Sequence, residues 1–322
     1  MRLARRLVLA VLILLTGAAP AAAERLRLVL DGAYGPQHVP ILTTALRGHF
    51  ERAGIELLIE PGLGANMATV LVGQRAFDLG HVSAHAAASA IARGAPIRMV
   101  AIYQPRSALA LVGLKERVRL DGPKSVEGLR VGIAPGTVDS LALTLFRRAH
   151  GIGISTLTVI PTDRAAKLPD LVAGRFDVVL ADAVPMRAAL LAQGLEPVVM
   201  DLADQGVPLQ GFGFIAHQAL MNENPALARK ALLALRAGFA DAAADPKRAC
   251  AEALARHAMA ETDEQCTTAL RIFLETLTPP DAPHWGRQSP EAWQRMIEAM
   301  RAAGEIQGTR PPSFYFTNAV AP

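Results

Sequence analysis

Between residues 26 and 200 the chain alternates short apolar runs with longer segments of helical periodicity. Continuous apolar strands separated by amphipathic helices are typical of mostly parallel sheets that carry helices on both faces. The expected strands cover residues 26–30, 55–59, 97–103, 109–114, 129–134, 157–161, 176–181 and 196–200, with a further strand-like run at 77–80. Helices are expected over 37–53, 65–74, 83–93, 138–149, 163–174 and 185–193.

After residue 216 the pattern changes. Residues 224–304 are almost wholly helical in character, and four Asn, Asp, Thr or Ser positions mark helix starts. The runs 104–110 and 208–214 are the best candidates for crossings between two sheets. We therefore predict an α/β chain of two lobes, each with a mostly parallel sheet and covering helices. The first lobe takes residues 24–105 and the mainly helical part 211–322, and the second takes 106–210.

The first 23 residues have the pattern of a cleaved signal peptide. Three arginines stand among the first six residues, an apolar run covers 7–15, and three alanines at 21–23 supply a small-residue cleavage site. The apolar run is shorter than the roughly 20 residues that a membrane span needs. We expect a mature chain that begins at Glu24, lies outside the cytoplasm and does not insert into the membrane. A retained signal anchor is the alternative.

Charge gives no reason to expect a nucleic-acid partner. The chain has 33 Lys and Arg against 29 Asp and Glu, but three arginines and no acid lie in the first 23 residues. The remaining chain has 30 basic and 29 acidic residues, so most of the net positive charge comes from the signal-peptide pattern.

We expect the chain to be a monomer.

Cys250 and Cys266 are the only cysteines, and both lie in segments of helical character separated by a turn. An even number of cysteines in an oxidising compartment permits one disulfide. The alternative is two buried thiols.

In open α/β sheets, ligands bind beyond the carboxyl ends of the strands. The turn after the first strand offers an aromatic ring, an amide and an imidazole from Tyr34, Gln37 and His38. We predict that these three side chains contact a ligand. The alternative is a plain helix-entry turn with His38 pointing to solvent.

Two glycine-bearing turns lead from a strand into a helix. Gly62, Gly64, Ala65 and Asn66 form the first, and its backbone N–H groups are suited to anions or carbonyl oxygens. An ordinary connecting loop is the alternative there. The second turn carries another three candidates, Gly136, Thr137 and Ser140. Thr137 can cap the following helix and still leave the helix end open to a ligand oxygen.

Two further candidates stand at strand ends. Ser83 is expected to cap a helix, and Asp182 either accepts a hydrogen bond from a ligand amine or caps its own helix. His81 or His85 could face the ligand, but no third ligand follows nearby, so no metal site is expected. No phosphate-binding loop, nucleophile elbow or paired-carboxylate signature is present, so we expect neither a cofactor nor an enzyme.

Several short motifs occur in an order that resembles one known superfamily. They are P-x-H-x-P (36–40), R-G-H-F-E-R-A-G-I-E-L (47–57), F-D-L-G (77–80), L-R-V-G-I-A-P-G-T (129–137), G-R-F-D-V-V-L-A-D (174–182) and Y-F-T-N (315–318). Together they resemble the periplasmic binding proteins for thiamine-pyrimidine precursors, alkanesulfonates, taurine and nitrate. The resemblance covers nearly all of residues 24–322 and implies the two-lobed class II periplasmic-binding-protein fold.

The first turn is similar to the pyrimidine-precursor branch of that superfamily, whose members carry an Asp-Trp, a Pro and a His there. Asp31, Pro36 and His38 match, whereas Gly32 stands where Trp is usual. Without that Trp, Tyr34 or Tyr103 would have to supply a stacking surface.

The resemblance implies a periplasmic protein that closes around a small ligand and delivers it to the permease and ATPase of an ABC importer. Pyrimidine-like heteroaromatic ligands are expected first, and sulfonate or carboxylate anions second. A ligand-presenting sensor subunit is an alternative. A pyrimidine synthase of the fungal type is less expected, because that route is intracellular.

Overall fold

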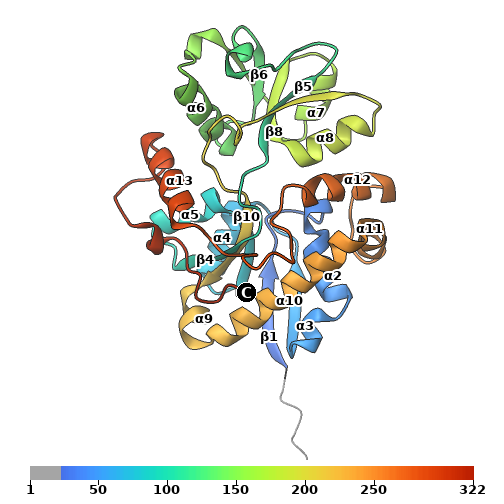
Figure 1. The fold of residues 1–322 in the computed structure, drawn as a ribbon, viewed down its shortest axis with the longest axis vertical. Coiled ribbons are helices and arrows are strands. Elements are labelled where there is room, and N and C mark those ends of the chain that lie inside the picture. The colour runs from blue at the N-terminus through green and yellow to red at the C-terminus, as the bar shows by residue number, and fades with distance from the viewer. Residues whose placement is uncertain (1–22) are drawn as a thin grey trace, which may run out of the picture.

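The computed structural model describes residues 23–322, so the signal-peptide pattern lies outside the described part of the chain (Figure 1). Two five-stranded sheets form its framework. The first has the strand order β2-β1-β3-β10-β4 and the second β7-β6-β8-β5-β9. The first sheet contains β1 (Glu24–Val29), β2 (Ile55–Glu60), β3 (Leu79–Ser83), β4 (Ile97–Ile102) and β10 (Phe212–His217). The second contains β5 (Leu109–Leu114), β6 (Arg130–Ile133), β7 (Thr158–Pro161), β8 (Val178–Asp182) and β9 (Pro197–Asp201).

Each sheet is parallel apart from one strand. In the first sheet β10 runs antiparallel to both β3 and β4, and in the second β5 runs antiparallel to both β8 and β9. These are the two strands that the chain enters directly from the other sheet, and such an entry reverses the strand direction. The predicted pair of mostly parallel sheets is therefore confirmed.

Two short segments, 103–108 and 202–211, connect the sheets. They are hydrogen-bonded to each other, since Gly211 N donates to Gln104 O at 3.1 Å and Ser107 N donates to Leu209 O at 2.9 Å. A Cβ atom at Gly211 would lie 2.2 Å from Gln104 Oε1, so only glycine permits this approach. The two connections therefore run side by side, in close contact, between the sheets.

Helices cover both faces of the first sheet. Figure 1 shows helices on both sides of this sheet in the lower half of the molecule. Leu28 of β1 lies in the apolar cluster that contains α2 (Val39–Leu46) and α10 (Pro225–Ala244), whereas Val29 lies in the cluster that contains α4 (Ala65–Gly73), α5 (Ala84–Ala92) and α13 (Pro290–Ala302). The helices that follow the strands of this sheet are η1 (Pro36–His38), α2 (Val39–Leu46), α3 (His49–Arg52), α4 (Ala65–Gly73) and α5 (Ala84–Ala92). The C-terminal part adds α9 (Gln218–Glu223), α10 (Pro225–Ala244), α11 (Pro246–Leu254), α12 (Asp263–Leu274), α13 (Pro290–Ala302) and η4 (Pro312–Phe314).

The second sheet is covered by η2 (Pro123–Val126), α6 (Val138–His150), η3 (Ile154–Thr156), α7 (Lys167–Val172) and α8 (Ala183–Leu191). Val184 and Ala188 of α8 join the apolar cluster that also contains α12 of the first sheet. On the opposite side, Arg148 of α6 donates a hydrogen bond to the carbonyl of Ala302 in α13. The two halves of the molecule therefore contact each other directly in two places, between α8 and α12 and between α6 and α13.

The expected elements differ from the observed ones in a few places. The helix expected over 37–53 is divided into η1, α2 and α3, because Gly48 adopts a left-handed conformation (φ 68°) that interrupts it. The strand-like run 77–80 is shifted, since β3 begins at Leu79. The helix expected from residue 163 begins at Lys167. β10 was expected only as part of a crossing segment and is instead the fourth strand of the first sheet.

Cys250 in α11 and Cys266 in α12 form a disulfide, which decides between the two alternatives that the sequence left open. Both side chains are fully buried in the apolar cluster around α10. The bond joins two helices that are neighbours in sequence, and α12 is the helix against which α8 packs. Among the described residues no helix is long and apolar enough to span a membrane.

Replacing both cysteines with alanine should lower the free energy of unfolding by about 3 kcal/mol. The two residues are 16 positions apart, and closing a loop of about that length in the unfolded chain accounts for this amount. Urea unfolding of the wild type and the double variant measures the difference. Dithiothreitol should shift the wild-type midpoint and leave the variant unchanged; a wild-type midpoint that is insensitive to reductant would contradict the account.

Candidate ligand-binding site

The connections between the sheets determine where a site can lie. β4 ends at the carboxyl edge of the first sheet, and after six connecting residues β5 begins at the carboxyl edge of the second. β9 and β10 are joined in the same way over ten residues. The carboxyl edges of the two sheets therefore face each other. The turns that follow β1 and β3 lie at the first of these edges, and those that follow β6 and β8 lie at the second.

Asp31, directly after β1, is the centre of the site. Its Oδ1 accepts a hydrogen bond from His38 Nε2 at 2.9 Å and another from His81 Nδ1 at 2.7 Å. The side chains of both histidines are fully buried, whereas that of Asp31 is 16% exposed. No described residue bonds to the second oxygen, Oδ2. The site thus presents a fixed carboxylate with one free oxygen at the edge of the sheet.

Both imidazoles act on the charge of Asp31. Burial by itself would raise the pKa of Asp31, but the neighbouring His81 and the hydrogen bonds from both imidazoles outweigh it, so this pKa lies well below its usual range. Burial lowers the pKa of His81 against the opposing effect of Asp31. Both directions fit an ionised carboxylate that accepts two hydrogen bonds from the buried imidazoles.

Tyr103 contacts His81 on the side away from Asp31. Its hydroxyl forms a hydrogen bond with His81 Nε2, and its ring lies between His81 and Trp285, stacked with both. Phe214 and Phe239 close the remaining sides. The residue is fully buried, which leaves no ring face open to a ligand; in this conformation Tyr103 orients His81 instead of stacking on a ligand.

The other side chains of the first turn are placed differently. Tyr34 is partly buried, donates its hydroxyl proton to Ile59 O at 3.2 Å and packs on His257 at a centroid distance of 4.7 Å. Gln37 is partly exposed. His38 does not point to solvent but into the protein, where its Nδ1 is buried without a hydrogen-bond partner among the described residues. The helix-entry alternative with an exposed imidazole is therefore excluded.

The turn 61–66 lies beside Asp31. Gly62 N donates to Gly32 O at 2.9 Å, and a Cβ atom at Gly62 would lie 1.8 Å from Leu30 O, so the two turns are in direct backbone contact. Gly64 precedes α4 with φ 116°, and Ala65 begins that helix. Asn66 is exposed. The structure thus brings Gly62 next to the aspartate and places Asn66 at the surface.

In the second sheet, Thr137 is the N-cap of α6. Its hydroxyl accepts from Asp139 N at 3.2 Å and donates to Ala134 O at 2.8 Å. Gly136 is exposed with φ 71°, and Ser140 is partly buried. Beneath this turn, Asp139 forms a buried ion pair with Lys167 at 2.5 Å and accepts from Ala134 N. The capping role of Thr137 is confirmed, and the buried pair fixes the turn.

Asp182 is the N-cap of α8, because its Oδ1 accepts from Val184 N at 2.9 Å. Burial raises the pKa of Asp182 to about 6, the capping hydrogen bond opposes this, and the charge of Asp31 adds to it. Asp31 follows β1 at the carboxyl edge of the first sheet, and Asp182 ends β8 at the carboxyl edge of the second. The helix cap that the sequence suggested is present, and ligand contact by Asp182 remains a prediction.

Ser83 stands at the N-cap position of α5, but its side chain makes no capping hydrogen bond, which corrects that expectation. Its hydroxyl lies 3.5 Å from His85 Nε2, and burial lowers the pKa of His85 to about 4. His81 turns away from His85 and toward Asp31. Local spacing offered no third metal ligand, yet the fold gathers Asp31, His38 and His81 with ligand atoms within 4.8 Å of one another.

Sequence reasoning named His81 only as one of two histidines that could face the ligand, and it did not place Asp31 among the ligand-binding residues. The available signals were an aspartate directly after the first strand and a histidine inside the third. Neither shows from sequence that strands β1 and β3 are neighbours, and that pairing is what brings the two side chains together.

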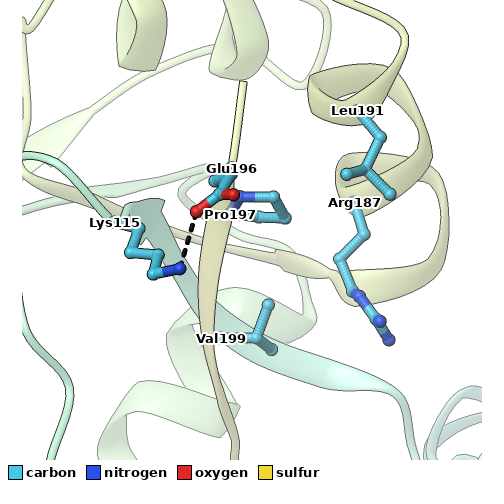
Figure 2. A pocket seen from close by; sticks show the side chains of 6 residues that line it. All are labelled: Lys115, Arg187, Leu191, Glu196, Pro197 and Val199. Atoms are coloured by element: carbon cyan, nitrogen blue, oxygen red, sulfur yellow. Dashed lines mark hydrogen bonds and ion pairs between the residues drawn. The ribbon is translucent and has the colours of Figure 1, made fainter. Parts of the chain in front are cut away.

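A surface hollow of about 560 Å³ lies elsewhere, lined by Lys115, Arg187, Leu191, Glu196, Pro197 and Val199 (Figure 2). Lys115 follows the end of β5 and Glu196 precedes β9, and the two form an ion pair at 2.7 Å. Both positions belong to the opposite edge of the second sheet. None of the expected ligand-binding residues lines this hollow, so it is separate from the candidate site.

The arrangement of two sheets with facing carboxyl edges defines a two-lobed periplasmic-binding-protein fold. It is shared by the aliphatic sulphonate binding protein SsuA of Escherichia coli (TM-score 0.73, 14% identity, 91% of this chain and 92% of that chain). SsuA of Xanthomonas axonopodis pv. citri, solved with bound MOPS, is also similar (TM-score 0.65, 13% identity, 90% and 96%).

Residues 35–249 match the family model described as NMT1/THI5 like, and the chain belongs to that family. Among characterised proteins, it is 24% identical over 303 residues to the riboflavin-binding protein RibY of Chloroflexus aurantiacus, covering 89% of this chain and 83% of that protein.

The raised pKa of Asp182 predicts a pH-dependent effect of Asp182→Asn. The folded protein holds this proton between about pH 4 and pH 6, where the unfolded chain has lost it, so wild-type stability falls across that window. Asparagine keeps the helix cap but carries no charge. The variant should therefore gain stability relative to the wild type as pH rises from 4 to 7, by at most about 3 kcal/mol.

Denaturant unfolding at several pH values measures this difference. Asp245→Asn is the matched control, because Asp245 caps α11 from an exposed position. A difference between Asp182→Asn and wild type that stays flat across pH would contradict the raised pKa of Asp182.

Proposed function

We propose that this protein is the periplasmic solute-binding component of an ABC importer. In this proposal, residues 24–105 and 211–322 form one lobe and residues 106–210 the other, and the lobes close on a small ligand between the facing sheet edges. The observation that carries the proposal is the fixed carboxylate of Asp31, with a free oxygen at one edge, opposite Asp182 at the other. The partners would be a permease and an ATPase, and the chain would act as a monomer without catalysis.

The ligand we propose first is a heteroaromatic molecule that carries N–H donors. Asp31 Oδ2 and Asp182 are acceptors on the two sides, and a ligand amine or ring N–H would satisfy both carboxylates. Partly exposed Gln37 and the backbone near Gly62 would complete the contacts at the first edge. A pyrimidine precursor of thiamine has this chemistry, and the similarity to a riboflavin-binding protein supports a nitrogen heterocycle.

A sulfonate or carboxylate anion is the second candidate. The capped N-terminus of α6, with Thr137 and Ser140, is suited to an anionic oxygen. The structural similarity to SsuA proteins supports this class. An anion would bind mainly at the second edge, because the charge of Asp31 repels it from the first.

Export to the periplasm is supported by the signal-peptide pattern of the first 23 residues and by the SsuA neighbours. The pattern and the neighbours agree with a protein that works outside the cytoplasmic membrane.

Thermal unfolding against a panel of ligands tests the proposal. The panel holds pyrimidine precursors, thiamine, riboflavin, taurine, alkanesulfonates, nitrate and aromatic carboxylates. A ligand at 100 times its dissociation constant should stabilise the protein by about 2.7 kcal/mol. A shift with one chemical class would support solute binding and name the class; folded, ligand-free protein that responds to none of them would contradict this ligand assignment.

Variants separate the two ligand classes. For a heteroaromatic ligand, His38→Ala and Tyr34→Ala should reduce the thermal shift most. For an anion, Thr137→Ala and Ser140→Ala should reduce it most. Equally small effects of all four substitutions would contradict both site descriptions.

A further inference from the structure

We propose that Asp31, His38 and His81 bind one divalent transition-metal ion, such as Zn²⁺, at the carboxyl edge of the first sheet. Two imidazole nitrogens and one carboxylate oxygen are the donors of zinc sites that keep a fourth position open. This inference goes beyond solute binding and does not depend on it, because the ion is measured without any organic ligand.

The donor atoms already converge. Asp31 Oδ1 lies 2.9 Å from His38 Nε2 and 2.7 Å from His81 Nδ1, and all three ligand atoms lie within 4.8 Å of one another. Both hydrogen bonds end on the same carboxylate oxygen, so the two ring nitrogens point at one small region. An ion with bonds of about 2.0–2.2 Å would take the place of the two bridging protons after small side-chain shifts.

The three residues come from rigid elements. Asp31 follows β1, His81 lies within β3, and these strands pair directly. His38 ends η1, next to α2. Both imidazoles are fully buried, and only Asp31 reaches solvent. Protein would therefore surround the ion on three sides, with the open position on the side of the facing sheet edge.

The far side of His81 is held in the way that metal-binding histidines require. Its Nε2 forms a hydrogen bond with the hydroxyl of Tyr103, and the Tyr103 ring is fixed by its stacking on Trp285. Such an outer hydrogen bond orients the ring of a metal ligand, and its loss commonly weakens metal binding tenfold to a hundredfold. Tyr103 is thus a positioning residue for the proposed ion.

Charge also favours a cation here. Within residues 23–322, Asp31 has no lysine or arginine within ion-pair distance, whereas the buried Asp139 at the start of α6 is paired with Lys167 at 2.5 Å. A largely buried carboxylate that lacks a cationic partner is costly. A bound divalent ion would supply the positive charge that Lys167 supplies in the second sheet.

Isothermal titration of Zn²⁺ into the chelator-treated, untagged chain tests the proposal, with the visible absorption of Co²⁺ as a second readout. We expect one ion per chain. Asp31→Asn and His38→Gln should each weaken binding at least tenfold, and Tyr103→Phe should weaken it by about tenfold to a hundredfold. His49→Gln is the matched control, because His49 also bonds to a carboxylate, Asp241 at 2.8 Å, but has no second imidazole beside it.

Circular dichroism and thermal unfolding without metal show whether each variant folds, and Asp31→Asn is the decisive variant because it is nearly isosteric and partly exposed. Absence of binding to folded wild type would overturn the proposal. So would binding that Asp31→Asn leaves intact. Neither result bears on the panel of organic ligands, so failure of the metal site and failure of the proposed function are distinguishable.

Discussion

A carboxylate held by two buried imidazoles is the interaction on which the candidate site depends. Asp31 alone would be costly to bury, and His38 and His81 make its ionised form stable at the end of β1. The same contacts explain the aromatic packing beneath. Tyr103 orients His81, and Trp285 together with Phe239 fixes Tyr103. A short polar turn is thereby connected to the core of the first sheet.

The connections between the sheets place the Asp31 carboxylate opposite the carboxyl edge of the second sheet. Two short crossing segments bring the carboxyl edges face to face. Gln104 O accepts from Gly211 N of the other segment at 3.1 Å, and the Gln104 side chain donates to Thr276 Oγ1 after α12 at 2.8 Å. The second edge then presents its own acceptor, Asp182, and the capped end of α6. The proposed recognition of a ligand by both halves of the molecule rests on this geometry, because neither edge by itself surrounds a small ligand.

Much of the fold could be predicted from local patterns. The strand 109–114 has the bounds that its apolar run suggested, and Cys250 pairs with Cys266 across a predicted helix turn. β10 was missed because Gly211 and Gly213 and its place after a crossing segment resemble a connection, and only its pairing with β3 and β4 makes it a strand. The site was harder to predict from the sequence, because Asp31 and His81 are 50 residues apart and no local pattern shows that their strands are neighbours.

The central claim is that the Asp31 carboxylate receives the ligand, and isothermal titration of the ligand found by the panel into Asp31→Asn tests it most directly. Asp241→Asn is the control, since Asp241 likewise accepts a hydrogen bond from an imidazole, that of His49, away from the sheet edge. A hydrogen bond to a charged group contributes about 1.5–3 kcal/mol, so Asp31→Asn should weaken binding at least about tenfold while the control binds as the wild type does. Equal affinity of Asp31→Asn and wild type would contradict the account.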